Sequence, residues 1–351
     1  MTQHVTSTDK QADNGASAAK VMTLTTTAVG SYPKPDYLAQ ARSQFSQGKI
    51  DREALAKLER QATEYWIRTQ ESAGLNVLVH GEMERGDMVA YFAGEPGGNT
   101  IIGMKLGGLV RSYGNRYYHK PIIVDNLAWP GPMTVDMWRY SQGLTERPVK
   151  GMLTGAYTMV EWSFDDYYPS RREAVLAMAR VIRREVEELV SAGCRYIQID
   201  EPAIHTRPEE DFDLAVEAMA LTVDGVKAEF HTHICYGEVE KIYPAMLRLP
   251  VKQIHLAFKN TDFAYLKLID EFGYNGAKDL GVGVTDVHTR FLESVDEVKD
   301  GIQETLKRLP PERLWIYPDC GLKTRSIEEA EGKLRVMADA VREVKRELEI
   351  D

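Results

Sequence analysis

Residues 171–202 read RREAVLAMARVIRREVEELVSAGCRYIQIDEP, and this stretch decides the fold. The apolar residues of Arg171–Ser191 recur at helical spacing, and Gly193 is a residue that commonly ends a helix. A short apolar run, Tyr196–Pro202, follows at once and has the length of a buried β-strand. A helix joined to a buried strand in this way predicts an α/β protein with a parallel sheet.

The same alternation extends along the whole chain. Apolar, strand-like runs occur at Leu24–Val29, Val77–Glu82, Val149–Gly155, Tyr196–Pro202, Glu229–Cys235, Lys252–Phe258, Gly281–Val287 and Leu314–Cys320. Helical patterns occur between them, at Ala54–Ser72, Arg171–Ser191, Phe212–Val223, Glu238–Arg248, Phe263–Phe272, Val295–Arg308 and Ile327–Leu348. Eight strands with intervening helices predict an α/β fold of the single (β/α)8 TIM barrel type, with its chemistry at the carboxyl ends of the strands.

One segment, residues 94–147, interrupts this alternation after the second predicted strand. Short alternating runs flank Gly114-Asn115, which is typical of a β-hairpin turn. We therefore expect a small antiparallel insertion within one barrel domain of residues 23–351. Residues 1–22 are polar and lack the apolar centre of a signal peptide, so we expect a disordered leader there.

The composition restricts the partners of the protein. The chain has 351 residues and a formal net charge of −10, which argues against a nucleic-acid partner because such binding needs basic patches. The sequence contains no run of 18 or more apolar residues, so we expect no membrane span. Three cysteines without a secretion signal make a disulfide framework improbable and indicate a reducing, cytoplasmic setting.

The residues that carry the most specific chemistry are His233, Cys235 and Cys320. Side chains alternate along a strand, so His233 and Cys235 are expected to point to the same face. Cys320 ends the last predicted strand, which lies beside the first strand in a closed barrel. Two thiolates and an imidazole suit zinc, and three protein ligands leave a position open, as in catalytic zinc sites.

Other polar residues near the strand ends have plain structural explanations. Asp319 is as compatible with capping the next helix as with a functional role. We expect His80 and His255 to be hydrogen-bonded barrel residues rather than ligands, and Cys194 to be a small buried apolar residue. Trp162 is equally compatible with core packing and with a ring that faces a ligand.

These segments together resemble the catalytic half of cobalamin-independent methionine synthase. The resemblance is carried by residues 25–33, 80–89, 150–155, 198–203, 231–236 and 318–325. It is collinear from about residue 24 to the end, and the chain resembles the short "core" form found in archaea and some bacteria, which lacks a second, N-terminal barrel. In that family the metal is zinc and the acceptor is homocysteine, whose sulfur joins the metal.

The resemblance implies that His233, Cys235 and Cys320 are the zinc ligands. Bound zinc would lower the pKa of the homocysteine thiol, so that a thiolate attacks the methyl group at neutral pH. The family usually supplies a further ligand, a glutamate, at the end of the sixth strand. Alignment puts Ala257 there, and alanine cannot bind a metal. The site therefore either has three protein ligands or recruits another carboxylate, such as Glu82 or Asp286.

Further family residues match positions in this chain. The clamp for the amino-acid part of homocysteine maps onto Ser31, Glu82 and Asp200, with the carboxylates suited to the ammonium group. Asp286 and His288 match a pair in which the histidine serves as proton donor, oriented by the aspartate.

The methyl donor is a separate question. Trp162 matches a tryptophan that lies against the donor in the family. Methyltetrahydrofolate is a poor donor until its nitrogen is protonated, and its polyglutamate tail has no obvious basic track here. We therefore favour methylcobalamin, delivered on a corrinoid protein, with methyltetrahydrofolate as the alternative. Another zinc-dependent thiol alkyltransferase, for example one acting on coenzyme M, and a non-enzymatic zinc- or corrinoid-binding protein remain open.

Overall fold

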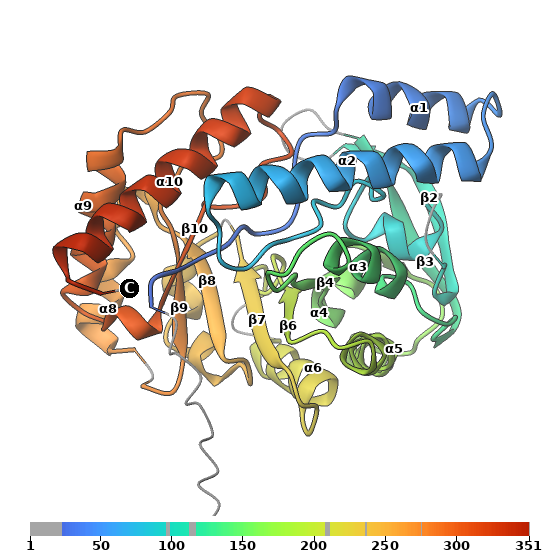
Figure 1. The fold of residues 1–351 in the computed structure, drawn as a ribbon. Helices are drawn as coiled ribbons and strands as arrows, with labels where there is room; N and C mark the ends of the chain where they lie inside the picture. Colours follow the sequence, from blue (N-terminus) through green and yellow to red (C-terminus); the bar gives the residue numbers. More distant parts are fainter. Residues whose placement is uncertain are drawn as a thin grey trace, which may run out of the picture.

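A curved sheet of seven parallel strands forms the centre of the computed structural model, which describes residues 23–95, 99–111, 117–207, 211–235, 237–274 and 276–350 (Figure 1). The strand order is β1-β10-β9-β8-β7-β6-β4. Their bounds are β1 Thr25–Thr26, β4 Gly151–Thr154, β6 Tyr196–Asp200, β7 Glu229–Ile234, β8 Gln253–Ala257, β9 Asp279–Gly283 and β10 Leu314–Tyr317. All seven strands consist of buried residues, apart from Glu229 at the start of β7, as expected for strands covered on both faces.

The predicted second strand, Val77–Glu82, is not a regular strand, and the eight-stranded sheet is not confirmed in that detail. Its residues make only isolated parallel bridges, Leu78 with Val149 and Gly81 with Ser31. Gly81 and the next residue have φ angles of 88° and 58°, which lie outside the β region and end any ladder. The segment therefore contacts both edges of the seven-stranded sheet without forming a strand.

Helices occupy the periphery of the molecule around this sheet (Figure 1). Their bounds are α1 Asp36–Ser46, α2 Arg52–Ala73, α3 Val135–Gln142, α4 Ala156–Glu161, α5 Arg171–Ser191, α6 Phe212–Val223, α7 Val239–Ile242, α8 Leu266–Phe272, α9 Val295–Leu306 and α10 Ile327–Glu347. No helix in the described part of the chain is long and apolar enough to cross a bilayer.

The helix predictions differ from the structure in two respects. The bounds predicted for α5 and α6 are confirmed, whereas the single helix predicted over Glu238–Arg248 is wrong. That segment forms α7 and a separate 3-10 turn, Ala245–Arg248, because Pro244 has no N–H with which to continue the helix. Helices α1, α3 and α4 were not predicted, and α3 lies within the segment expected to be an antiparallel insertion.

An antiparallel hairpin lies within residues 94–147. It consists of β2 (Ile102–Arg111) and β3 (Tyr117–Ala128), and β5 (Phe164–Asp165) adds to β3 in parallel. The hairpin lies on the side of the molecule away from α8, α9 and α10 (Figure 1). The predicted Gly114-Asn115 turn and the predicted leader, residues 1–22, lie outside the described residues.

Candidate functional site

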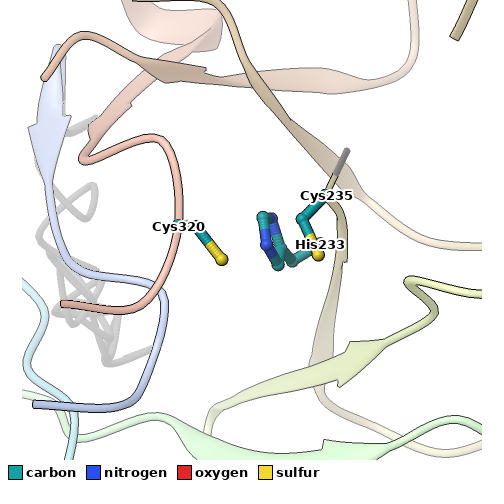
Figure 2. Close-up of side chains that lie close together, drawn as sticks. All are labelled: His233, Cys235 and Cys320. Atoms are coloured by element: carbon teal, nitrogen blue, oxygen red, sulfur yellow. The ribbon is translucent and has the colours of Figure 1, made fainter. Parts of the chain in front are cut away.

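Three potential metal ligands converge at the carboxyl ends of β7 and β10. His233 lies near the end of β7, Cys235 follows that strand directly, and Cys320 lies in the loop after β10. One ligand atom from each lies within 4.8 Å of the other two. Figure 2 shows the Cys320 side chain pointing from its loop toward the other two residues. Strands β8 and β9 separate β7 from β10, so the curvature of the sheet brings the three side chains together.

The three side chains fit a zinc ion. Zinc bonds of about 2.3 Å to sulfur and 2.0 Å to nitrogen place tetrahedral ligand atoms roughly 3.5–3.8 Å apart. The three ligand atoms here lie within 4.8 Å of one another, so small side-chain adjustments would bring them to that spacing. Nε2 of His233 is buried and has no hydrogen-bond partner. A buried polar atom of this kind needs a partner, and a cation supplies one. The donor set and this orphaned nitrogen therefore both favour a thiophilic metal.

The two thiols differ in acidity. A hydrogen bond between them lowers the pKa of Cys320 well below its ordinary value and raises that of Cys235 well above it. His233, beside Cys320, lowers the Cys320 pKa further. Burial is the largest single influence on the His233 pKa and lowers it, but the charge of Cys320, its hydrogen bond and the charge of Asp200 together outweigh burial, so the net direction is upward. Cys320 is therefore the sulfur that ionises first.

Asp319 fixes the loop that carries Cys320. Its fully buried carboxylate accepts hydrogen bonds from the backbone N–H groups of Lys259 and Asn260, at 3.0 and 2.7 Å. Gly283 makes room for it, because a Cβ there would lie 2.2 Å from Asp319 Oδ1. Asp319 thus caps a turn after β8, a different segment from the helix that follows it in the chain.

The structure confirms three plain assignments made from the sequence. Cys194 is 3% exposed and lies away from the two other cysteines, at the amino end of β6. His80 and His255 are buried and hydrogen-bonded, His80 to the N–H of Glu82 and His255 to His233. Ala257, at the end of β8, is also buried and has no atom that binds a metal.

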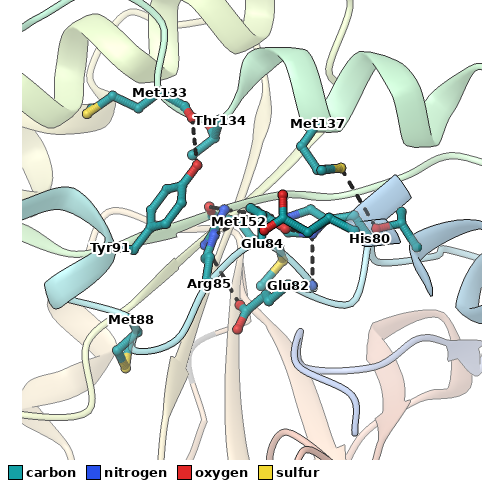
Figure 3. Close-up of polar contacts among 12 residues, drawn as sticks. His80, Glu82, Glu84, Arg85, Met88, Tyr91, Met133, Thr134, Met137 and Met152 are labelled. Atoms are coloured by element: carbon teal, nitrogen blue, oxygen red, sulfur yellow. Dashed lines mark hydrogen bonds and ion pairs between the residues drawn. The ribbon is translucent and has the colours of Figure 1, made fainter. Parts of the chain in front are cut away.

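Glu82 has a strained backbone conformation and lies at the same end of the sheet as the metal ligands. Its φ angle of 58° is uncommon for a residue with a side chain, and such strain is concentrated at functional sites. His80 Nδ1 accepts its N–H at 2.9 Å, and Lys34 donates to its carbonyl at 3.2 Å. Arg85 lies 3.8 Å from Glu82 Oε1 (Figure 3). This network presents a carboxylate whose backbone is fixed in advance.

Asp200, at the end of β6, is the second carboxylate of the site. Its Oδ1 accepts a hydrogen bond of 2.7 Å from Gln198 Nε2, and the Gln198 oxygen in turn accepts one of 2.5 Å from Lys150. Burial raises the pKa of Asp200 to about 7, while His233 and the Gln198 hydrogen bond oppose that rise and Glu82 adds to it. Sequence analysis missed Lys150 and Gln198, although a lysine beside an apolar strand was a visible signal.

Lys150 predicts a specific pH dependence of stability. Burial lowers the pKa of this fully buried amine to about 7. The unfolded chain keeps its proton up to a pH of about 10.4, so the unfolded state binds more protons between these values. Stability must therefore rise with pH from 7 toward 10, and the cost of burying the charge is fully present below 7.

Lys150→Met should remove this pH dependence of stability. We expect the free energy of unfolding of the wild type, relative to the variant, to increase by up to about 1.4 kcal/mol per pH unit above pH 7. Urea unfolding of both proteins at pH 7, 8 and 9 measures the difference and cancels the other titrating groups. A difference that stays constant with pH would contradict the shift.

The remaining predicted site residues are less closely assembled. Ser31 lies beside Gly321, where an added Cβ would meet Ser31 Oγ at 2.2 Å. Trp162 is half-buried at the end of α4. The Asp286 carboxylate accepts the backbone N–H of His288 at 2.8 Å, and His288 is exposed. The predicted orientation of the His288 ring by Asp286 therefore stays a prediction.

Comparisons with known proteins agree on one family. Residues 24–343 match the family model "Cobalamin-independent synthase, Catalytic domain". A methionine synthase from Saccharolobus solfataricus is 38% identical over 331 residues, which cover 94% of this chain and 97% of that protein. One from Sulfolobus acidocaldarius is 36% identical over 330 residues and 94% of each chain.

Solved structures show the same fold. A B12-independent methionine synthase from Shewanella sp. W3-18-1, solved with selenomethionine, superposes with a TM-score of 0.80 at 25% identity, covering 93% of this chain and 99% of that one. A putative vitamin-B12 independent methionine synthase from Listeria monocytogenes gives 0.73 at 19% identity, over 90% and 96% of the two chains.

These findings correct the prediction of the donor. The matching family is described as cobalamin-independent and the Shewanella protein as B12-independent. Neither description supports methylcobalamin as the donor or a corrinoid protein as partner. We therefore favour the alternative donor, methyltetrahydrofolate.

Proposed function

This chain belongs to the cobalamin-independent methionine synthase family, whose members are methyltransferases acting on homocysteine, and from that premise we propose that it forms methionine at a zinc centre with methyltetrahydrofolate as donor. The observation that carries the proposal is the convergence of His233, Cys235 and Cys320 within 4.8 Å. A non-catalytic metal protein would need the same three ligands but would not need carboxylates beside them.

The three ligands would hold zinc and leave one position for a substrate atom. Zinc bound there would lower the pKa of the homocysteine thiol, so that homocysteine reacts as its thiolate at neutral pH. Ala257 adds no fourth protein ligand, and we propose that the site works with three. One carboxylate fewer leaves the centre less negative, which favours a stronger attraction for the incoming thiolate.

Glu82 and Asp200 would bind the ammonium group of homocysteine. The burial of Asp200 is costly for a lone carboxylate, and an ammonium beside it offsets that cost. Ser31, beside Gly321, would meet the substrate carboxylate. A sulfonate thiol such as coenzyme M has no ammonium group, so two carboxylates at this place disfavour it.

The donor side would be served by Trp162, Asp286 and His288. Methyltetrahydrofolate transfers its methyl group only when its nitrogen is protonated, and His288 is the titratable group proposed to supply that proton. Its exposure keeps it in contact with solvent, from which it can be reprotonated. Trp162 would stack against the ring system of the donor.

We also propose that residues 76–82, the predicted second strand, complete the barrel between β1 and β4. Residues 23–351 would then form one domain, with the β2–β3 hairpin as an insertion. The backbone supports the first point, since Leu78 exchanges hydrogen bonds with Pro148 and Lys150, and the N–H groups of Asn76 and Val77 donate to Thr26.

An assay of methionine formation tests the function. Zinc-loaded protein with homocysteine should form methionine from methyltetrahydrofolate, with its mono- and polyglutamate forms compared. Methylcobalamin serves as the rival donor in parallel reactions. Methionine from methylcobalamin alone would overturn the proposed donor, and no methionine from either donor, despite bound zinc, would overturn the proposed reaction.

A further inference from the structure

His255 on β8 lies directly beside His233 on β7. The two residues are partners in the parallel register of these strands, so their side chains leave the sheet on the same face. Their Nδ1 atoms are 2.6 Å apart, and their rings stack with centroids 4.7 Å apart at an interplanar angle of 29°. Both rings are buried, with exposures of 2% or less.

This contact restricts which nitrogen of His233 carries a proton. Two imidazole nitrogens at hydrogen-bond distance need one N–H between them. If Nδ1–H of His233 donates, its Nε2 carries a lone pair, which is the form that binds a cation. If His255 donates instead, His233 Nε2 carries the hydrogen and binds no metal. The orphaned Nε2 of His233 is therefore a ligand only in the first arrangement.

His255 is itself held firmly in place. The Tyr317 ring stacks on it, with centroids 4.2 Å apart and an interplanar angle of 26°. Gly281 on β9 leaves the space that it needs, because a Cβ there would lie 2.8 Å from the His255 Cβ. Tyr317 is anchored in turn by a hydrogen bond from its hydroxyl to Gln253. The acceptor offered to His233 therefore has a fixed position.

We propose that His255 is a positioning residue of the metal centre: its Nδ1 accepts the Nδ1–H of His233 and so directs His233 Nε2 to zinc. The inference rests on the proposed zinc site. Histidine ligands usually donate their second N–H to a carboxylate, a backbone carbonyl or water. A neutral imidazole in that place adds no negative charge, in the same chain that has Ala257 where the family has a glutamate ligand.

Two substitutions separate the acceptor from the bulk of the ring. His255→Leu removes the acceptor, whereas His255→Asn places an amide oxygen where Nδ1 was, one bond from Cγ. We expect the zinc dissociation constant, measured by chelator competition, to rise about 10- to 100-fold in the leucine variant. The asparagine variant should recover most of that loss. Visible absorption of the Co²⁺-loaded proteins should change in the leucine variant and return toward wild type in the asparagine variant.

His231→Gln is the matched control. His231 is another buried histidine on β7 and is hydrogen-bonded to Glu229. It lies two residues before His233, so it is on the same face of the strand but further from its carboxyl end. We expect its substitution to leave the zinc affinity unchanged. Denaturant unfolding of the metal-free proteins shows whether each variant folds.

The outcomes distinguish this inference from the function on which it rests. Zinc affinity of a folded His255→Leu variant within about twofold of wild type would overturn the inference alone, as would an asparagine variant no better than leucine. If His255→Leu does not fold, the asparagine variant alone decides, because it must keep near-wild-type affinity. A wild-type protein that does not bind zinc would overturn the inference together with the proposed metal centre, whereas zinc binding without methionine formation would leave the inference standing.

Discussion

Cys320→Ala is expected to abolish zinc retention and methionine formation together. Cys320 supplies the thiolate with the lowered pKa, so its loss removes both a ligand atom and the charge that raises the His233 pKa most. Loss of an outer partner alone costs about 10- to 100-fold in metal affinity, and loss of a direct ligand should exceed that. Because metal catalysis supplies several kcal/mol, methionine formation should fall at least about a hundredfold.

Cys194→Ala is the matched control for this substitution. Burial raises the pKa of Cys194 to about 12, and its thiol donates to the backbone carbonyl of Tyr196 at 3.2 Å. This cysteine lies at the amino end of β6, far along the strand from the metal ligands, so zinc content and activity should stay near wild type. Metal analysis after gel filtration and a methionine assay measure both quantities. Stoichiometric zinc in purified Cys320→Ala would contradict the assignment.

Alkylation gives a second readout of the same centre. In zinc-free protein Cys320 should react with iodoacetamide before Cys235, because the hydrogen bond between them lowers the pKa of Cys320 and raises that of Cys235. Added zinc should protect both thiols, and mass spectrometry of the peptides identifies the order.

The sequence predicted best those elements whose signals are local. For α5, the helical period of the apolar residues and the Gly193 that follows them are local signals, and both predicted ends are confirmed. Of the strands that carry the metal ligands, β10 is marked by an unbroken apolar run, whereas His231, Thr232 and His233 interrupt the run of β7. Their ends are less visible: β10 ends at Tyr317, so Cys320 lies in a loop rather than on the strand.

The segment Val77–Glu82 shows why the rest could not be predicted. Its composition is that of a strand, but the side-chain amide of Gln70 pairs with both backbone groups of Val79, at 2.8 and 2.9 Å. That amide occupies the hydrogen-bonding groups that a neighbouring strand would need. Such a tertiary contact overrides β-propensity and leaves no trace in the local pattern.

The candidate site divides in the same way. The shared face of His233 and Cys235 follows from the alternation of side chains along one strand. The contact of His233 with His255 depends on the register of β7 against β8, which the sequence does not specify. The link from Lys150 through Gln198 to Asp200 joins the start of β4 to β6, and this pairing likewise depends on a strand register that the sequence does not specify.

Asp200→Asn is expected to weaken homocysteine binding far more than it slows the methyl transfer. Asp200 is 8% exposed, and Gln198 holds its Oδ1 in place, so its charge faces the proposed ammonium site without screening by water. Removing one partner of a buried charge pair costs about 2–5 kcal/mol. The KM for homocysteine should therefore rise about 30- to 5,000-fold, with a smaller change in kcat.

Glu201→Gln is the matched control, since it makes the same change of carboxylate to amide at the adjacent position. Both Glu201 oxygens are already occupied by Tyr157 and Thr158, at the start of α4, so they are not available to a substrate. We expect this variant to keep the wild-type KM for homocysteine, and denaturant unfolding measures any change in its stability.

A thiol without the amino group tests the role of Asp200 directly. The wild type should prefer homocysteine strongly over 4-mercaptobutanoate, because only homocysteine places an ammonium against the two carboxylates. In Asp200→Asn that preference should largely disappear, because the neutral amide no longer attracts the ammonium group of homocysteine and no longer repels 4-mercaptobutanoate. If the variant instead keeps the full preference, the ammonium is bound elsewhere, and Glu82 alone becomes the group to substitute next.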